Sequence, residues 1–207
     1  MKNIISITAA TGILFLANSA FACTSDTPNE WECLIEDTAN PATAINLINQ
    51  GKQGPYTFSG TTKLKAGLLS ATCDLTLNGL VEMKDEATSG VPGGVVFIEV
   101  TGGSIGGGGT CSILSLGNFP WEATLNGTPG IPGANGGDIS PPFVGSAVAD
   151  MSGIEVQPVA CSGTLPNISF NNGSSAGDPS YFEFNGSFGG CSVEGTLLAV
   201  DGDVDAW

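Results

Sequence analysis

Cysteine and carboxylate are the residue types that could do chemistry in this 207-residue chain, because the sequence contains no histidine. Without histidine, the chain cannot form a Ser-His-Asp triad, a Cys-His pair or a histidine-ligated zinc site. The glycine run from Gly106 to Gly109 lacks the Lys and Ser/Thr that hold phosphate and metal in a P-loop. Paired carboxylates, as in glycosidases, are the catalytic arrangement that remains.

Two glutamates lie in apolar segments that read as strands, Glu99 and Glu183. Burial in such a strand would raise the pKa of a carboxyl group, as a general acid requires. A glutamate on the outer face of a strand is the commoner arrangement, and no nucleophile motif accompanies either residue. We therefore predict that the protein is not an enzyme, with no catalytic residue and no cofactor.

Alternating aspartates near the carboxyl end, Asp201, Asp203 and Asp205, would lie on one side of an extended chain. Hard carboxylate oxygens suit calcium, but the segment lacks the later bidentate glutamate of a calcium loop. A solvated acidic tail is the favoured interpretation, so we assign no metal ligands and leave calcium binding at these three residues open.

Six cysteines offer a complete set of disulfides, and they are Cys23, Cys33, Cys73, Cys111, Cys161 and Cys191. Their number alone does not fix the connectivity. The segment Cys73-Asp-Leu-Thr-Leu77 resembles Cys161-Ser-Gly-Thr-Leu165, and glycines precede both Cys111 and Cys191. This echo favours Cys73–Cys111 and Cys161–Cys191, each closing one strand pair, and leaves Cys23 with Cys33. This internal similarity indicates either a two-fold repeat or two hairpins that are each held by a disulfide in a similar way.

The amino-terminal residues 1–22 read as a secretory signal. Lys2 supplies the positive charge, residues 4–16 are apolar but short for a membrane span, and Ala20-Phe21-Ala22 forms a cleavage site. We predict cleavage after Ala22 and a secreted, extracellular protein, with the periplasm or cell surface as alternatives. A lipid-modified Cys23 is the other hypothesis, but it would leave one cysteine without a partner.

The formal net charge of −15 excludes classes of partner. Nucleic-acid binding requires a basic face, and anionic membrane surfaces repel an acidic chain. No second apolar run is long enough to span a membrane, so we expect the mature chain to be soluble.

The periodicity of the mature chain is mostly that of strands. Leu75 and Leu77 alternate with polar neighbours, and Val95 to Val100 suits a strand covered on both faces. Residues 40–51 are the exception, because Asn40-Pro41 can begin a short helix and Gly51 can end it. We predict an all-β, disulfide-stapled antiparallel sandwich or barrel over residues 56–207, preceded by an acidic disulfide loop and short helix over residues 23–55.

Several short motifs together resemble the secreted alkane oxidation protein activators of pseudomonads. They are Ser59-Gly60-Thr61-Thr62, Ala71-Thr72-Cys73, Thr110-Cys111-Ser112-Ile113, Pro120-Trp121, Gly189-Gly190-Cys191-Ser192-Val193 and Gly195-Thr196-Leu197. The resemblance covers about Tyr56 to Val200, and residues 23–51 look like an addition to it.

The resemblance implies an extracellular, non-enzymatic protein that promotes growth on hydrocarbons, associated with the cell surface or biofilm matrix. Hydrocarbon and cell-surface or matrix components are then the expected partners. The alternative is an adhesive or self-assembling extracellular β subunit, because Gly/Asn-rich β chains with open edges can pair edge to edge.

Overall fold

The computed structural model describes residues 34–36, 45–92, 94–126, 146–171, 179–200 and 204–206. The predicted signal segment, the Cys23–Cys33 loop and residues 40–44 lie outside this part of the chain. Eight strands form the main body: β3 (Gln53–Ala66), β4 (Leu69–Lys84), β5 (Val95–Gly106), β7 (Trp121–Asn126), β8 (Ser146–Gln157), β9 (Cys161–Asn171), β10 (Tyr181–Phe188) and β11 (Cys191–Ala199).

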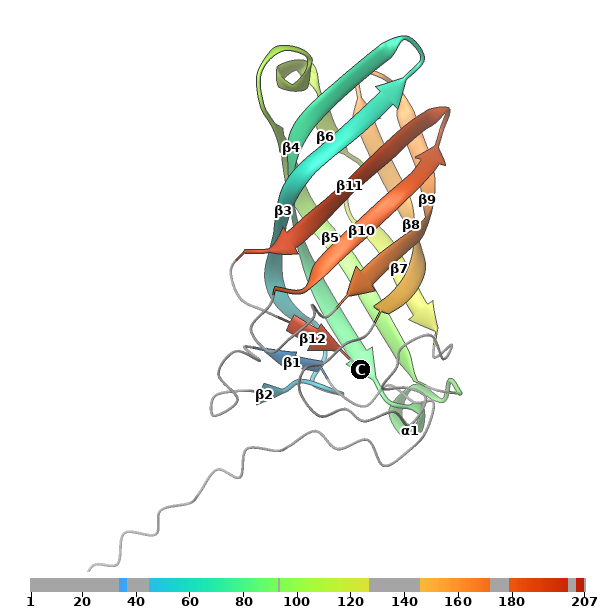
Figure 1. The fold of residues 1–207 in the computed structure, drawn as a ribbon. Helices are drawn as coiled ribbons and strands as arrows, with labels where there is room; N and C mark the ends of the chain where they lie inside the picture. Colours follow the sequence, from blue (N-terminus) through green and yellow to red (C-terminus); the bar gives the residue numbers. More distant parts are fainter. Residues whose placement is uncertain are drawn as a thin grey trace, which may run out of the picture.

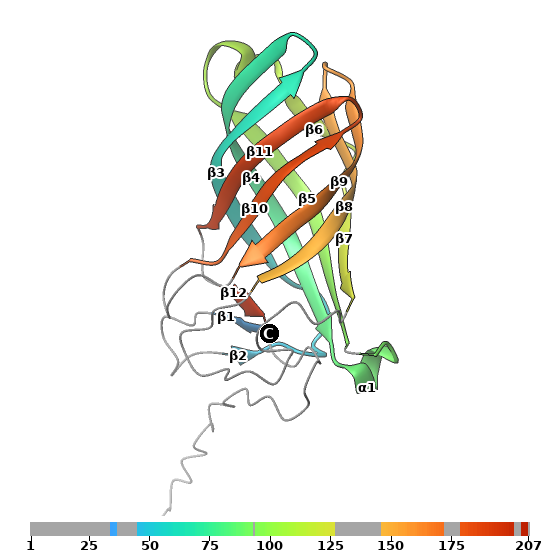
Figure 2. The ribbon, with the colours of Figure 1, turned by 45° about the vertical axis from the view of Figure 1, so that its right-hand side comes forward.

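These eight strands close into an antiparallel barrel (Figure 1). Their order is β8-β7-β5-β4-β3-β11-β10-β9, and β9 pairs with β8 to complete the ring. The turned view shows the same tilted, closed wall of strands (Figure 2). A short strand, β6 (Ser115–Gly117), pairs with residues 155–157 of β8, whereas β7 pairs with Met151 and Ser152 of the same strand. The all-β prediction is therefore confirmed, and the architecture is a barrel.

A small sheet of order β12-β1-β2 joins the two ends of the described chain. It contains β1 (Leu34–Glu36), β2 (Ile45–Asn46) and β12 (Val204–Ala206). The predicted helix over residues 40–51 is wrong in its described part, because Ile45 and Asn46 pair with β1 and a turn follows. Leu47 then buries its side chain, and the Asn49 N–H donates to the Met83 carbonyl at 2.8 Å. These contacts outweigh the modest helix preference of the segment.

The α-helix that forms in the described residues is instead α1 (Glu86–Ser89), after β4. Asp85 caps it, because its carboxylate accepts from the Thr88 N–H at 2.7 Å. Gly90 ends the helix in the left-handed conformation, which glycine adopts without a steric penalty. The N–H of Asp85 donates to the side chain of Asn49 at 3.3 Å, so the cap also ties the helix to the turn after β2.

Alternation along each strand separates the inside of the barrel from its surface. In β4, the buried residues Ala71, Cys73 and Leu75 alternate with exposed neighbours, as the period of a half-buried strand requires. The expectation that β5 is covered on both faces is wrong. Phe97 is 38 % exposed on the outer face of that strand, whereas its neighbours Val96 and Ile98 are buried.

One glycine permits the close contact between β3 and β11, two barrel strands that are far apart in the sequence. At Gly60 in β3, an added Cβ would collide with the carbonyl oxygen of Thr196 in β11. The β3–β11 ladder passes this point between the pairs Thr62–Gly195 and Ser59–Leu198. A residue without a side chain is therefore required at this point of the contact between β3 and β11.

Both described disulfides lie at the end of the barrel that carries the β3–β4, β8–β9 and β10–β11 turns. Cys73–Cys111 has a Cα–Cα separation of 5.6 Å and Cys161–Cys191 one of 5.7 Å, so both predicted pairings are confirmed. They do not each close a strand pair. The first joins β4 to the 3-10 helix η1 (Gly109–Ile113), and the second joins β9 to β11, which flank β10.

Candidate functional site

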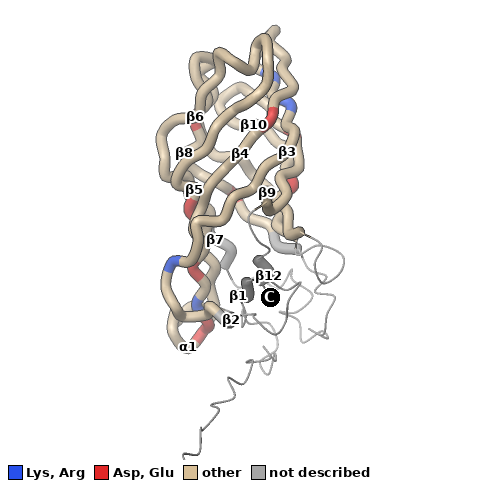
Figure 3. Tube along the Cα trace, turned by 90° about the vertical axis from the view of Figure 1, so that its left-hand side faces the viewer, with Lys and Arg blue, Asp and Glu red and all other residues tan. Residues whose placement is uncertain are grey.

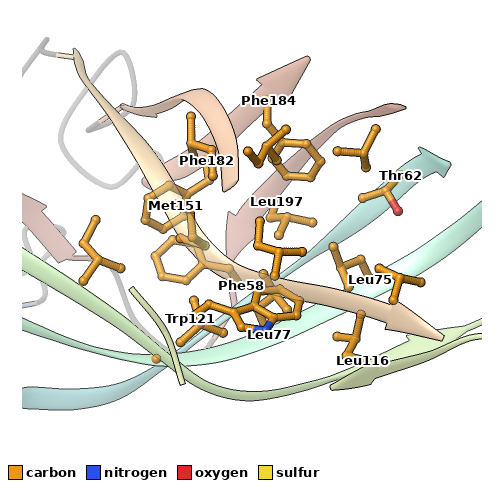
Figure 4. Close-up of a pocket in the computed structure, with 18 of the residues that line it drawn as sticks. Phe58, Thr62, Leu75, Leu77, Leu116, Trp121, Met151, Phe182, Phe184 and Leu197 are labelled. Carbon is orange, nitrogen blue, oxygen red and sulfur yellow. The ribbon is translucent and has the colours of Figure 1, made fainter. Parts of the chain in front are cut away.

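The interior of the barrel contains a cavity of about 100 Å³. Every barrel strand contributes apolar side chains to its wall, and Figure 4 shows them converging on a common space. Met151 lies among large apolar groups from other strands, which include Phe58, Phe182 and Leu197. The rings of Phe58 and Phe182 meet edge to face with centroids 4.8 Å apart. An eight-stranded barrel has room for side chains or for one small ligand, and this interior combines the two.

Two polar side chains on this wall, Thr62 and Trp121, make hydrogen bonds to the barrel itself. Thr62 is buried, and its hydroxyl donates to the Cys73 carbonyl at 3.4 Å. The indole Nε1–H of Trp121 donates to the Gly117 carbonyl at 2.8 Å. Because both groups are satisfied by backbone oxygens, neither needs a polar partner from a molecule in the cavity. The described wall is otherwise built mainly of aliphatic and aromatic side chains, so its chemistry is that of hydrocarbon contact.

The structure does not bring Glu99 and Glu183 together. Glu99 lies on β5 and Glu183 on β10, and three barrel strands separate them in either direction around the ring. Glu183 is exposed, and the carboxylate of Glu99 faces the outside, where its Oε2 accepts from Lys52 Nζ at 2.6 Å. The arrangement is that of two separate outer-face glutamates, which cannot flank one scissile bond.

Glu99 belongs to a charged groove on the outer wall, with a volume of about 350 Å³. Glu122 lies directly opposite Glu99 across β5 and β7, and like charges in that position repel. Lys52 offsets this repulsion. Its hydrogen bond to Glu99 outweighs desolvation and raises the pKa of Lys52, with further help from the charges of Glu99, Glu82 and Glu122.

The same groove contains an exposed aromatic ring. The ring belongs to Phe97, and Lys84 Nζ lies 5.6 Å from its centroid. Lys84 Nζ also forms an ion pair with Glu82 Oε1 at 2.9 Å. In Figure 3, blue and red backbone positions of lysines and acidic residues lie near one another toward the end of the barrel that carries α1. The lysines and glutamates of the groove thus neutralise one another in part, which is a stabilising role for the sheet.

The acidic carboxyl-terminal segment is described only in part. Asp205 lies in β12, whereas Asp201 and Asp203 lie outside the described residues. Within the described part of the chain, no three acidic or cysteine side chains gather as metal ligands would. In the same residues, no helix is both long and apolar enough to cross a membrane.

Sequence reasoning missed the cavity and the charged groove. The cavity is visible in the sequence only as the inward half of each alternating strand, such as Leu75 and Leu77 of β4 or Ile98 and Val100 of β5. Alternation identifies an inner face but does not say how many strands enclose it. The groove requires Lys52, before β3, to reach β5, and local sequence carries no sign of that approach.

One of three comparisons with known proteins gave a match. The model of the family described as alkane oxidation protein activator PraA/PraB-like matches residues 1–204. The match includes residues 23–51, which the sequence motifs had suggested were an addition. No curated protein and no solved structure gave a significant match.

Proposed function

Because the chain belongs to the alkane oxidation protein activator PraA/PraB-like family, we propose that it promotes the utilisation of hydrocarbons as a secreted, non-enzymatic protein. It works outside the cell, at the cell surface or in the biofilm matrix. In this role the protein changes how cells gain access to an apolar substrate and leaves the oxidation itself to other proteins.

The observation that supports this proposal best is the apolar interior of the barrel. Alkanes have no polar group, so a protein can engage them only by offering apolar surface shielded from water. The strands place that surface inside and an acidic, water-compatible face outside, which suits a protein that must remain dispersed in an aqueous medium.

The alternative, an adhesive or self-assembling subunit, has less support. It depended on open strand edges that could pair between molecules. Closure of the ring through β8 and β9 uses the edges of the barrel strands within the chain itself. Size-exclusion chromatography over a range of protein concentrations, with and without hexadecane, separates the hypotheses, since assembly requires polymers that grow with concentration.

Growth of a producing strain tests the proposed function. Deletion of the gene should slow growth on n-hexadecane and leave growth on succinate unchanged. Purified protein added to the medium should restore the alkane growth rate, because the protein acts outside the cell. Equal growth of the deletion and parent strains on hexadecane would contradict the proposal. A loss of surface attachment on both carbon sources would favour the adhesive alternative.

A further inference from the structure

The barrel cavity has the composition of a ligand site and not only of a packed core. Its wall draws apolar side chains from every strand of the ring, and it leaves about 100 Å³ unfilled. Protein interiors seldom leave voids larger than a water molecule. Apolar cavities of about 150 Å³ remain dry and bind benzene. The space in this barrel is smaller, so it suits a thin alkyl chain better than a ring.

Charge is absent from the described wall of the cavity and concentrated on the outside. Lys52 and Lys84 bind the outer-wall glutamates, and Lys63 pairs with Glu194 at 3.1 Å across β3 and β11. No lysine is among the described residues that line the cavity. A carboxylate inside would therefore lose its hydration without gaining a cationic partner, which is strongly unfavourable.

From these observations we propose that the cavity is a binding site for one short, uncharged alkyl chain, and that it rejects the same chain carrying a terminal carboxylate. The inference rests on the proposed function and refines it, because it names the interior as the place of contact. The cavity would also distinguish an alkane from the carboxylic acid formed by its oxidation, because it would bind the alkane and release the acid.

The adaptability of the wall favours an unbranched chain. Met151 is unbranched and polarisable, and methionine side chains adjust to irregular apolar shapes. Leu197, which is 1 % exposed, lies on the inner face of β11 beside the cavity. Its neighbour Leu198 is 45 % exposed on the outer face and does not line the cavity. The two leucines therefore provide a matched pair for substitution.

The methionines provide an internal probe. Met151 lines the cavity, whereas Met83 is fully buried but is not part of the cavity wall. Met1 lies in the predicted signal, so the exported protein contains these two methyl thioethers. In the exported protein labelled with [methyl-13C]methionine, n-pentane should shift the Met151 resonance and leave that of Met83 in place. Pentanoate at neutral pH should bind on the order of 100-fold more weakly.

Substitution at the matched leucines tests whether the binding is inside the barrel. Leu197→Phe should abolish the n-pentane shift by filling the cavity, whereas Leu198→Phe should leave it unchanged. Leu197→Ala should enlarge the cavity, strengthen the response and admit n-octane, and Leu198→Ala should not. The Met83 resonance reports whether each variant is folded. If Leu197→Phe does not fold, the comparison of Leu197→Ala with Leu198→Ala still tests whether binding is inside the barrel.

Three results would overturn the inference: no Met151 shift with n-pentane in both the parent and Leu197→Ala, an equal response to pentanoate, or equal shifts at Met83 and Met151. A protein that fails this test but restores growth on hexadecane refutes the cavity site and leaves the proposed function intact. A protein that binds n-pentane but whose deletion does not change alkane growth refutes the function and leaves the site intact.

Discussion

Gly60 is the residue at which a single added methyl group should disturb the barrel most directly. A Cβ there would collide with the backbone of Thr196, and a backbone oxygen cannot move aside as a flexible side chain can. Gly60→Ala should therefore lower the free energy of unfolding by roughly 1–3 kcal/mol, the usual range for overpacking. Urea denaturation followed by tryptophan fluorescence measures the change.

Gly102 provides the control for this substitution. It also lies in a barrel strand, but apart from its own chain neighbours no described atom lies within 4 Å of the position that a Cβ would take. Gly102→Ala should leave stability unchanged or raise it slightly, because alanine restricts the unfolded chain. Equal denaturation midpoints for Gly60→Ala and Gly102→Ala would show that the close approach of β3 and β11 is not a constraint.

Asp85 should make the stability of α1 depend on pH. Desolvation raises the pKa of its carboxyl group, but hydrogen bonds from Thr88 and Asn49 together lower the pKa below the ordinary value of 3.8. A lowered folded-state pKa gives stability that is fully present above pH 3.8 and is lost as the pH falls through the folded-state value. Asp85→Ala should cost about 1 kcal/mol near neutral pH through loss of the cap.

Denaturation of the parent and Asp85→Ala at pH 7 and in strong acid checks this behaviour. The stability difference between them should shrink in acid, where the parent carboxylate is protonated. Glu86→Gln serves as the control, because Glu86 follows the cap in the first turn and is not the cap itself. A difference that stays constant with pH would contradict the role of the charged cap.

At the scale of elements, the disulfides hold η1 and the ends of β9 and β11 in place. Cys73–Cys111 spans 38 residues of sequence and Cys161–Cys191 spans 30. The loop-entropy relation gives about 4 kcal/mol for each closed loop. Replacing either pair with serine should therefore destabilise the barrel by a similar, large amount in thermal or urea melts.

The amino-terminal pair should matter less. If Cys23 bonds to Cys33, the short loop restricts the unfolded chain by only about 2.7 kcal/mol. Cys23→Ser/Cys33→Ser should thus melt closer to the parent than either barrel pair does, with its strands intact by circular dichroism. Peptide mapping without reduction checks the linkage itself. A loss as large as that of Cys73→Ser/Cys111→Ser would make the amino-terminal segment part of the core.

Strand positions were predictable because alternation is local. The alternation of Leu75 and Leu77 with polar neighbours predicted a strand, and the structure places both leucines in β4. The helix error arose at Ile45–Asn46, where pairing with a distant strand overrode local preference. The α-helix of the described residues, α1, is only four residues long, so its sequence signal lies in the caps at Asp85 and Gly90 and not in an apolar pattern.

At the scale of the whole molecule, we predict that export sets the covalent form of the protein. We predict cleavage after Ala22, because the residues before it have the charged, apolar and small-residue regions of a secretory signal. The intact mass of the exported protein should correspond to a chain that begins at Cys23. A diacylglyceryl addition on Cys23, or retention of residues 1–22, would contradict this prediction.

Barrel closure could not be read from the sequence. A sandwich and a barrel share the same alternating strands, and they differ in whether β8 and β9 pair with each other. That pairing depends on register and tilt around the whole ring, which no segment encodes by itself. The cavity follows from closure, so it became visible only when all the inner faces were placed together.

The pairing of β3 with β11 also limits how early in synthesis the barrel can be completed. Lys63 on β3 and Glu194 on β11 are 131 residues apart, so one edge of β3 stays unpaired until nearly the whole chain is available. A polypeptide that crosses a membrane amino end first would therefore complete its passage before the ring could form. We predict that this late pairing would keep an exported chain unfolded during transport, and that β3 could pair with a wrong strand until β11 is available.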